Sequence, residues 1–257
     1  MNANTSVRWL TCLTVALLLC GCVTTTNNRP VTKKRDAAML NVQLGIAYLD
    51  QGDLNLAKDK LDKAIKQDAS LPAVHSAWAM LYDRLNKPKQ ADEEFREALR
   101  LAPNDPGTLN NYAVYLCRTG RTEEGVKLFL DVAQNGLYRT PEAAYTNAGV
   151  CLRAAKKYDL AVEQLQRALK VRPNYAEAEY QLVELQFTQG DLPAARSQLD
   201  RFLGFFNATP DLLLVGVRIT RAQGDKLAAE KLSRKLRVDF PDSDQARRLT
   251  ELDRNPG

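Results

Sequence analysis

The strongest constraint on the fold is a pattern that recurs every 34 to 36 residues. The tripeptide Gln-Gly-Asp occurs three times, each time before a stretch that carries leucine and alanine. When these glycines are aligned, three further segments fall into the same register, and successive copies are 34, 34, 36, 34 and 34 residues apart. A period of this length is typical of stacked pairs of antiparallel helices joined by tight turns. The turn residues of the six copies are Gly52, Asn86, Gly120, Lys156, Gly190 and Gly224.

Two further positions of each copy are mostly small, as expected where two helices touch. The eighth residues of the copies are Gly45, Ala79, Ala113, Gly149, Val183 and Val217. The twentieth residues are Ala57, Ala91, Gly125, Ala161, Ala195 and Ala229. This pattern resembles the tetratricopeptide repeat, a helix-turn-helix unit of 34 residues.

The resemblance implies an all-α fold, a right-handed superhelical solenoid of six tetratricopeptide repeats. We place the repeats at residues 38–71, 72–105, 106–141, 142–175, 176–209 and 210–243. Residues 244–257 begin with a charged stretch that contains leucine, and we expect a short C-terminal capping helix there, because a solenoid needs a polar cover on its open end. Repeat 3 has two extra residues near its exit turn, and Phe202 and Leu236 stand in repeats 5 and 6 where the pattern has alanine.

The amino terminus carries a targeting signal. Residues 1–21 have one basic residue, Arg8, and an apolar core that is too short to span a bilayer but suits a secretory signal. The core ends in Leu19-Cys20-Gly21-Cys22, which resembles the bacterial lipoprotein box. The resemblance implies that Cys22 becomes the first mature residue and carries the acyl chains; an ordinary cleaved signal is the alternative. A zinc pair is disfavoured, because no second pair of ligands follows at a matching distance.

Val23 follows the lipidated cysteine, and in the lipoprotein family the absence of aspartate at this position implies sorting to the outer membrane. The body of the protein is then expected on the periplasmic face. We interpret residues 22–37 as the lipidated cysteine and a flexible tether, because the segment is polar and shows no apolar period.

In this repeat family, the first helix of each pair lines the concave face, with positions 2, 5, 9 and 12 pointing inward. Repeat 1 is the only copy in which all four positions are apolar, and a soluble solenoid rarely exposes such a stripe without a use. We expect it to bind an amphipathic segment of a partner. The alternative is that the tether or a neighbouring turn covers it. The predicted groove residues are Met39, Val42, Ile46, Leu49 and Met80.

No catalytic or metal-binding constellation is visible, so we expect a protein that is not an enzyme and has no cofactor other than the lipid on Cys22. His75, the only histidine, falls at a packing position without a nucleophile nearby in sequence. Cys117 and Cys151 remain after processing and are either a disulfide or two buried free thiols. The net charge of +5 is small and acids are interspersed, which disfavours nucleic-acid binding. Charged runs such as DEEFRE are interpreted as solvated faces of second helices.

The lipoprotein box and six repeats together resemble the type IV pilus biogenesis lipoproteins, or pilotins, of the PilF/PilW kind. The segments NNYAVYLCRTGR (residues 110–121) and AYTNAGVC (residues 144–151) are also similar to that family. The resemblance implies a protein that binds the pilus secretin, brings it to the outer membrane and promotes its assembly into a ring. The alternative is another lipoprotein adaptor, which scaffolds peptidoglycan enzymes or the outer-membrane protein insertion machinery.

Overall fold

The structure is a computed structural model, and it describes residues 29–254. The signal sequence and Cys22 lie outside the described residues. All regular structure between residues 29 and 254 is helical. The helices are α1 (Arg29–Asp50), α2 (Leu54–Gln67), α3 (Pro72–Arg84), α4 (Pro88–Leu101), α5 (Pro106–Arg118), α6 (Thr122–Ala133), α7 (Pro141–Ala154), α8 (Tyr158–Val171), α9 (Ala176–Thr188), α10 (Leu192–Phe205), α11 (Pro210–Ala222), α12 (Lys226–Asp239) and α13 (Asp244–Arg254).

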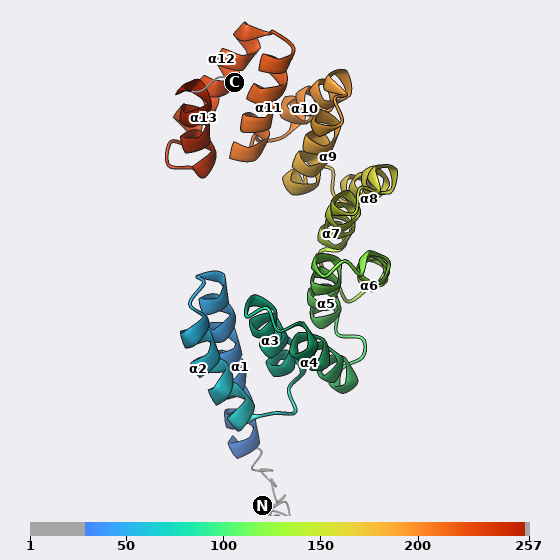
Figure 1. Ribbon diagram of the computed structural model, residues 1–257, viewed down its shortest axis with the longest axis vertical. Helices are drawn as coiled ribbons and strands as arrows, with labels where there is room; N and C mark the ends of the chain where they lie inside the picture. Colours follow the sequence, from blue (N-terminus) through green and yellow to red (C-terminus); the bar gives the residue numbers. More distant parts are fainter. Residues whose placement is uncertain (1–28, 255–257) are drawn as a thin grey trace, which may run out of the picture.

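The helices α1 to α12 stack as six pairs along a curved arc (Figure 1). In the middle of the arc, the first helices α5 and α7 lie on the inner side and the second helices α6 and α8 on the outer side. At the C-terminal end, α13 packs on the last pair, where Ala246 and Leu249 join a cluster with residues of α11 and α12. The predicted all-α solenoid of helix pairs is therefore confirmed.

The turns inside the six pairs share one backbone conformation. All six turn residues have a left-handed backbone, with φ between 55° and 84°. Four of them are glycines, for which this region costs little, while Asn86 and Lys156 adopt it with a side chain. In the copies with Gln-Gly-Asp, the aspartate caps the second helix; for example, Asp53 accepts a hydrogen bond from the backbone N–H of Leu56 at 3.0 Å.

The two helices of a pair touch through small residues. A Cβ atom added to Gly45 would lie 2.7 Å from Leu61 Cδ2, and one added to Gly149 would lie 2.7 Å from Leu165 Cγ. Contacts this short do not occur between real side chains, so a larger residue would require Leu61 or Leu165 to move. The glycines at the eighth position of repeats 1 and 4 thus let a leucine of the second helix pack directly against the first helix.

The N-terminal boundary of the solenoid differs from the expected one. Helix α1 begins at Arg29, so residues 29–37, which we assigned to a flexible tether, are helical. The segment 31–40 contains no helix breaker and includes lysine, arginine, alanine, methionine and leucine, which favour helix. Pro30 stands in the first turn, where a missing N–H is tolerated. The expectation of a tether up to residue 37 was therefore wrong from residue 29 onward.

The left-handed turn at Lys156 provides a test of the turn geometry. Lys156→Gly removes the steric cost of a left-handed non-glycine residue, which is about 1–2 kcal/mol, against a smaller entropic loss from glycine. We expect a net gain in the free energy of unfolding of roughly 0.5–1 kcal/mol, measured by urea denaturation. The matched change Gly190→Lys should lower the free energy by a comparable amount. If both variants had the same free energy of unfolding as the parent, the left-handed backbone at residues 156 and 190 would be contradicted.

Candidate partner-binding surface

The groove predicted on repeat 1 is only partly open. Val42 is 2% exposed and Leu49 is 1% exposed. Both lie in the hydrophobic cluster that α1 and α2 form with Val74 and Trp78 of α3. The prediction that these two side chains line an open groove was wrong, because α3 packs against the face of α1 that carries them. A charged substitution at Val42 would disrupt the core and would not test binding alone.

The other predicted groove residues keep some exposure. Met39 is half-buried, and Ile46 and Met80 pack against the edge of the same cluster while remaining partly accessible. Met80 also lines a 550 Å³ cleft between α3 and α5. Val114 is half-exposed in this cleft, and Asp83 and Arg118 form an ion pair there.

Helix α1 has a second apolar face, which the sequence reasoning missed. Leu40 is 57% exposed and Leu44 is 38% exposed. The corresponding residues of repeat 2, 34 positions later, are Val74 and Trp78, and both are buried. Since no repeat precedes α1 in the described chain, its third and seventh positions stay uncovered. The sequence could have indicated this face, because the first repeat has leucines at the two positions that are buried against a preceding repeat in repeat 2.

Charge replaces apolar character at the far end of the inner surface. The ninth positions of repeats 1 to 4 carry Ile46, Met80, Val114 and Val150. In repeats 5 and 6, Glu184 and Arg218 occupy this position, and Arg218 Nη1 lies 2.9 Å from both carboxylate oxygens. The Arg218 guanidinium also lies 4.7 Å from the centre of the Phe187 ring. An apolar ligand therefore finds more contact surface on the first four repeats.

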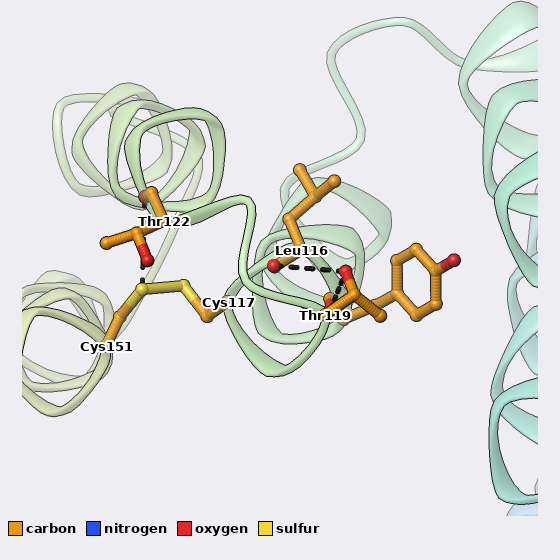
Figure 2. The surroundings of a disulfide bond; sticks show 6 residues. Leu116, Cys117, Thr119, Thr122 and Cys151 are labelled. Atoms are coloured by element: carbon orange, nitrogen blue, oxygen red, sulfur yellow. Dashed lines mark hydrogen bonds between the residues drawn. A yellow bond between two sulfur atoms is a disulfide. The ribbon is translucent and has the colours of Figure 1, made fainter. Parts of the chain in front are cut away.

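Cys117 and Cys151 form a disulfide that joins α5 to α7, with Cα atoms 5.5 Å apart (Figure 2). The Sγ atom of Cys151 also contacts the carbonyl oxygen of Thr122 at 3.9 Å. Space for the bridge depends on Gly125, because a Cβ at this position would lie 2.5 Å from Cys117 Sγ. The bridge spans the junction between repeats 3 and 4, where the two extra residues lengthen the connection between α6 and α7.

His75 has a structural environment. Its Nδ1 lies 2.7 Å from Glu94 Oε2, and its Nε2 lies 2.9 Å from the carbonyl oxygen of Ala69. Because both ring nitrogens face acceptors, the imidazolium form is favoured, and the hydrogen bond to Glu94 raises the pKa of His75 above its usual value. Glu94 belongs to the DEEFRE run, so this acid is not simply a solvated residue.

Glu179 of repeat 5 occupies the same repeat position as His75 and is 1% exposed. Its Oε2 accepts a hydrogen bond from Gln198 Nε2 at 2.8 Å, whereas Oε1 has no partner among the described residues. Burial raises the pKa of Glu179 to about 7, against the weaker opposing effect of the Gln198 hydrogen bond. Sequence reasoning passed over this residue, because Glu179 and Gln198 lie 19 positions apart on different helices.

Within residues 29–254, no helix combines the length and the apolar character needed to cross a bilayer. Cys22, the predicted lipidation site, precedes this part of the chain, and its modification stays a prediction.

The chain is similar in sequence to known proteins over nearly its whole length. Models of the tetratricopeptide repeat match residues 72–105 and 152–213. The type IV pilus assembly protein PilF of Pseudomonas aeruginosa is 30% identical over 241 residues, which cover 93% of this chain and 96% of PilF. The chain belongs to the PilF family.

Solved structures agree with this assignment. A structure from the functional characterisation of Pseudomonas aeruginosa PilF superposes with a TM-score of 0.63 at 27% identity, covering 85% of this chain and 99% of that one. The crystal structure of PilW, described as a widely conserved type IV pilus biogenesis factor, gives the same TM-score and identity and covers 83% of this chain and 98% of PilW. The predicted family is confirmed: this chain is a tetratricopeptide-repeat protein related to type IV pilus biogenesis factors.

The contribution of the disulfide to stability is measurable. The bridge closes a loop of 34 residues. In the chain-entropy model, a disulfide that closes a loop of this size stabilises the fold by about 3–4 kcal/mol, because it restricts the unfolded chain. We expect the double variant Cys117→Ser/Cys151→Ser to lose about that much free energy of unfolding in urea. A reductant should lower the free energy of unfolding of the parent to that of the variant and leave the variant unchanged. If the parent and the variant unfold at the same urea concentration without reductant, the bridge is not formed.

The raised pKa of Glu179 predicts a pH-dependent stability. A carboxyl whose pKa rises from its ordinary 4.5 to about 7 on folding stabilises the fold below pH 4.5, and this contribution is lost as pH rises to 7. The free energy of unfolding of Glu179→Gln should therefore match that of the parent near pH 4 and exceed it at pH 8 by about 3 kcal/mol. Comparing the two proteins at each pH in urea cancels the effect of His75. A constant difference from pH 4 to pH 8 would contradict the burial of the charge.

Proposed function

We propose that this protein is an outer-membrane pilotin, which binds the type IV pilus secretin and promotes its localisation and multimerisation. The relation to PilF over nearly the full length of both chains carries the proposal. PilW, a relative of known structure, is described as a type IV pilus biogenesis factor, which supports a role for this protein in the same process.

Two features of the chain support the proposed location. The motif that ends in Cys22 resembles the lipoprotein box, and acyl chains on this residue would anchor the protein in the outer membrane, facing the periplasm. The Cys117–Cys151 disulfide fits the same compartment, because the periplasm is oxidising.

The proposed mechanism is binding without chemistry. Stacked helix pairs provide a rigid surface, and side chains on that surface select a partner segment. We place the contact with the secretin on α1, where Leu40 and Leu44 form an exposed apolar face and Met39 lies beside them in sequence. An amphipathic helix of the partner would cover this face much as a preceding repeat would.

A double variant on α1 tests this placement. Leu40→Glu/Leu44→Glu puts two charges on the exposed face, so the fold should persist while the secretin no longer co-purifies from detergent-solubilised envelopes. Losing two central apolar contacts should weaken binding by at least about 100-fold. Secretin multimers and surface pili should then fall to the level of a deletion strain.

The control is Leu227→Glu, a change at a leucine on α12 that is 81% exposed, more than Leu40 or Leu44. It should leave both secretin recovery and pili unchanged. Normal multimers in the deletion strain would contradict the pilotin role itself. Recovery of peptidoglycan hydrolases or of the insertion machinery in place of the secretin would support the adaptor alternative.

A further inference from the structure

A cavity of 350 Å³ lies between α8, α9 and α10, away from the α1 face. Its walls are mostly apolar and include Leu169, Leu182 and Phe202. Phe202 is the residue that replaces the alanine of other repeats, for example Ala64, Ala98 and Ala168. The phenyl ring is almost completely buried, so it occupies space between α10 and its neighbours that a methyl group would leave to closer helix packing.

Glu179 lines this cavity and is its only acidic residue. The carboxylate is 1% exposed, and Oε1 has no hydrogen-bond partner among the described residues. A buried carboxylate with an unmet oxygen is costly, and a cation that donates hydrogen bonds to it removes much of that cost.

The residues that correspond to Glu179 and Gln198 in repeat 2 are a different pair. There, the fourth and twenty-third positions hold His75 and Glu94, whose Nδ1 and Oε2 atoms lie 2.7 Å apart and form an ion pair when His75 is protonated. In repeat 5, the same two positions hold Glu179 and Gln198. The hydrogen-bond partner of the Glu179 carboxylate is therefore neutral, and the only cation of the lining that acts on it electrostatically is the exposed Arg201.

The rim of the cavity is aromatic. Phe205 is 79% exposed and Phe206 also remains accessible, with the Phe206 ring centre 5.0 Å from that of Phe202. Exposed aromatic faces attract the stems and charged heads of lysine and arginine side chains. Arg201 is the only basic residue of the lining, and it hydrogen-bonds Gln198 Oε1 on the exposed side.

We propose that this cavity is a second docking site, which takes a lysine or arginine side chain of a partner protein together with an adjacent apolar residue. The basic group pairs with Glu179, and the apolar residue lies against Phe205 and Phe206. A basic guest is favoured over an acidic one because Arg201 is exposed and already hydrogen-bonded to Gln198, whereas Glu179 is buried and its Oε1 atom has no hydrogen-bond partner among the described residues. The site does not depend on which protein binds α1.

Three blocked peptides that differ in one side chain test this site. They are acetyl-Leu-Lys-Phe-amide, its norleucine analogue and its glutamate analogue. Binding to the protein is followed at pH 8 by NMR shifts of the cavity residues. The lysine peptide should bind roughly tenfold more tightly than the norleucine peptide, because it adds a charged hydrogen bond.

Glu179→Gln keeps the shape of the side chain and the partner Gln198, so it should fold and should abolish the preference for lysine over norleucine. Arg201→Gln removes the only competing cation and should strengthen lysine binding. Leu227→Glu, far along the chain on α12, should change neither. Equal affinity for lysine and norleucine peptides, tighter binding of the glutamate peptide, or no shift at the cavity with millimolar peptide would each overturn the proposal. None of these outcomes bears on secretin binding.

Discussion

The contact between the two helices of each pair is the constraint on which the rest of the structure depends. Where Gly45 meets Leu61 and Gly149 meets Leu165, a Cβ atom on the first helix would displace the leucine of the second helix. This contact lets the two helices pack directly against each other, and the left-handed turn fixes the way the chain reverses between them. Because the same unit recurs every 34 residues, stacking it produces a curved solenoid whose inner surface is formed by first helices (Figure 1).

The single departure from this period lies beside the disulfide. Repeat 3 is longer than the others, and the chain needs residues 134–140 to connect α6 to α7. A longer connection constrains the next pair less, whereas the Cys117–Cys151 bridge ties the two first helices together directly (Figure 2). The bridge thus restores, at one junction, the fixed orientation that the short connections give elsewhere. The requirement for Gly125 beside Cys117 shows that the small position of this repeat accommodates the bridge as well as the helix.

Local features could be predicted from the sequence, whereas contacts between repeats could not. The turn residues, including Asn86 and Lys156, followed from the alignment of copies, because a tight turn depends on a few neighbouring residues. The burial of Val42 and Leu49 depends on how far α3 covers α1, which the period does not reveal. The pair of Glu179 and Gln198 was missed for a related reason: each residue alone is compatible with a solvated helix face, and only the packing of α10 on α9 brings them together.

The two ends of the solenoid differ in a way that bears on the proposed role. At the C-terminal end, α13 covers the apolar face of the last pair. At the N-terminal end, α1 leaves Leu40 and Leu44 exposed. On the proposed lipidation, only seven Cα–Cα steps separate Cys22 from the start of α1, so the helix begins within about 25 Å of the anchored residue. On this proposal, the uncovered apolar face belongs to the end of the solenoid held near the bilayer, where the proposed partner, the secretin, would meet it.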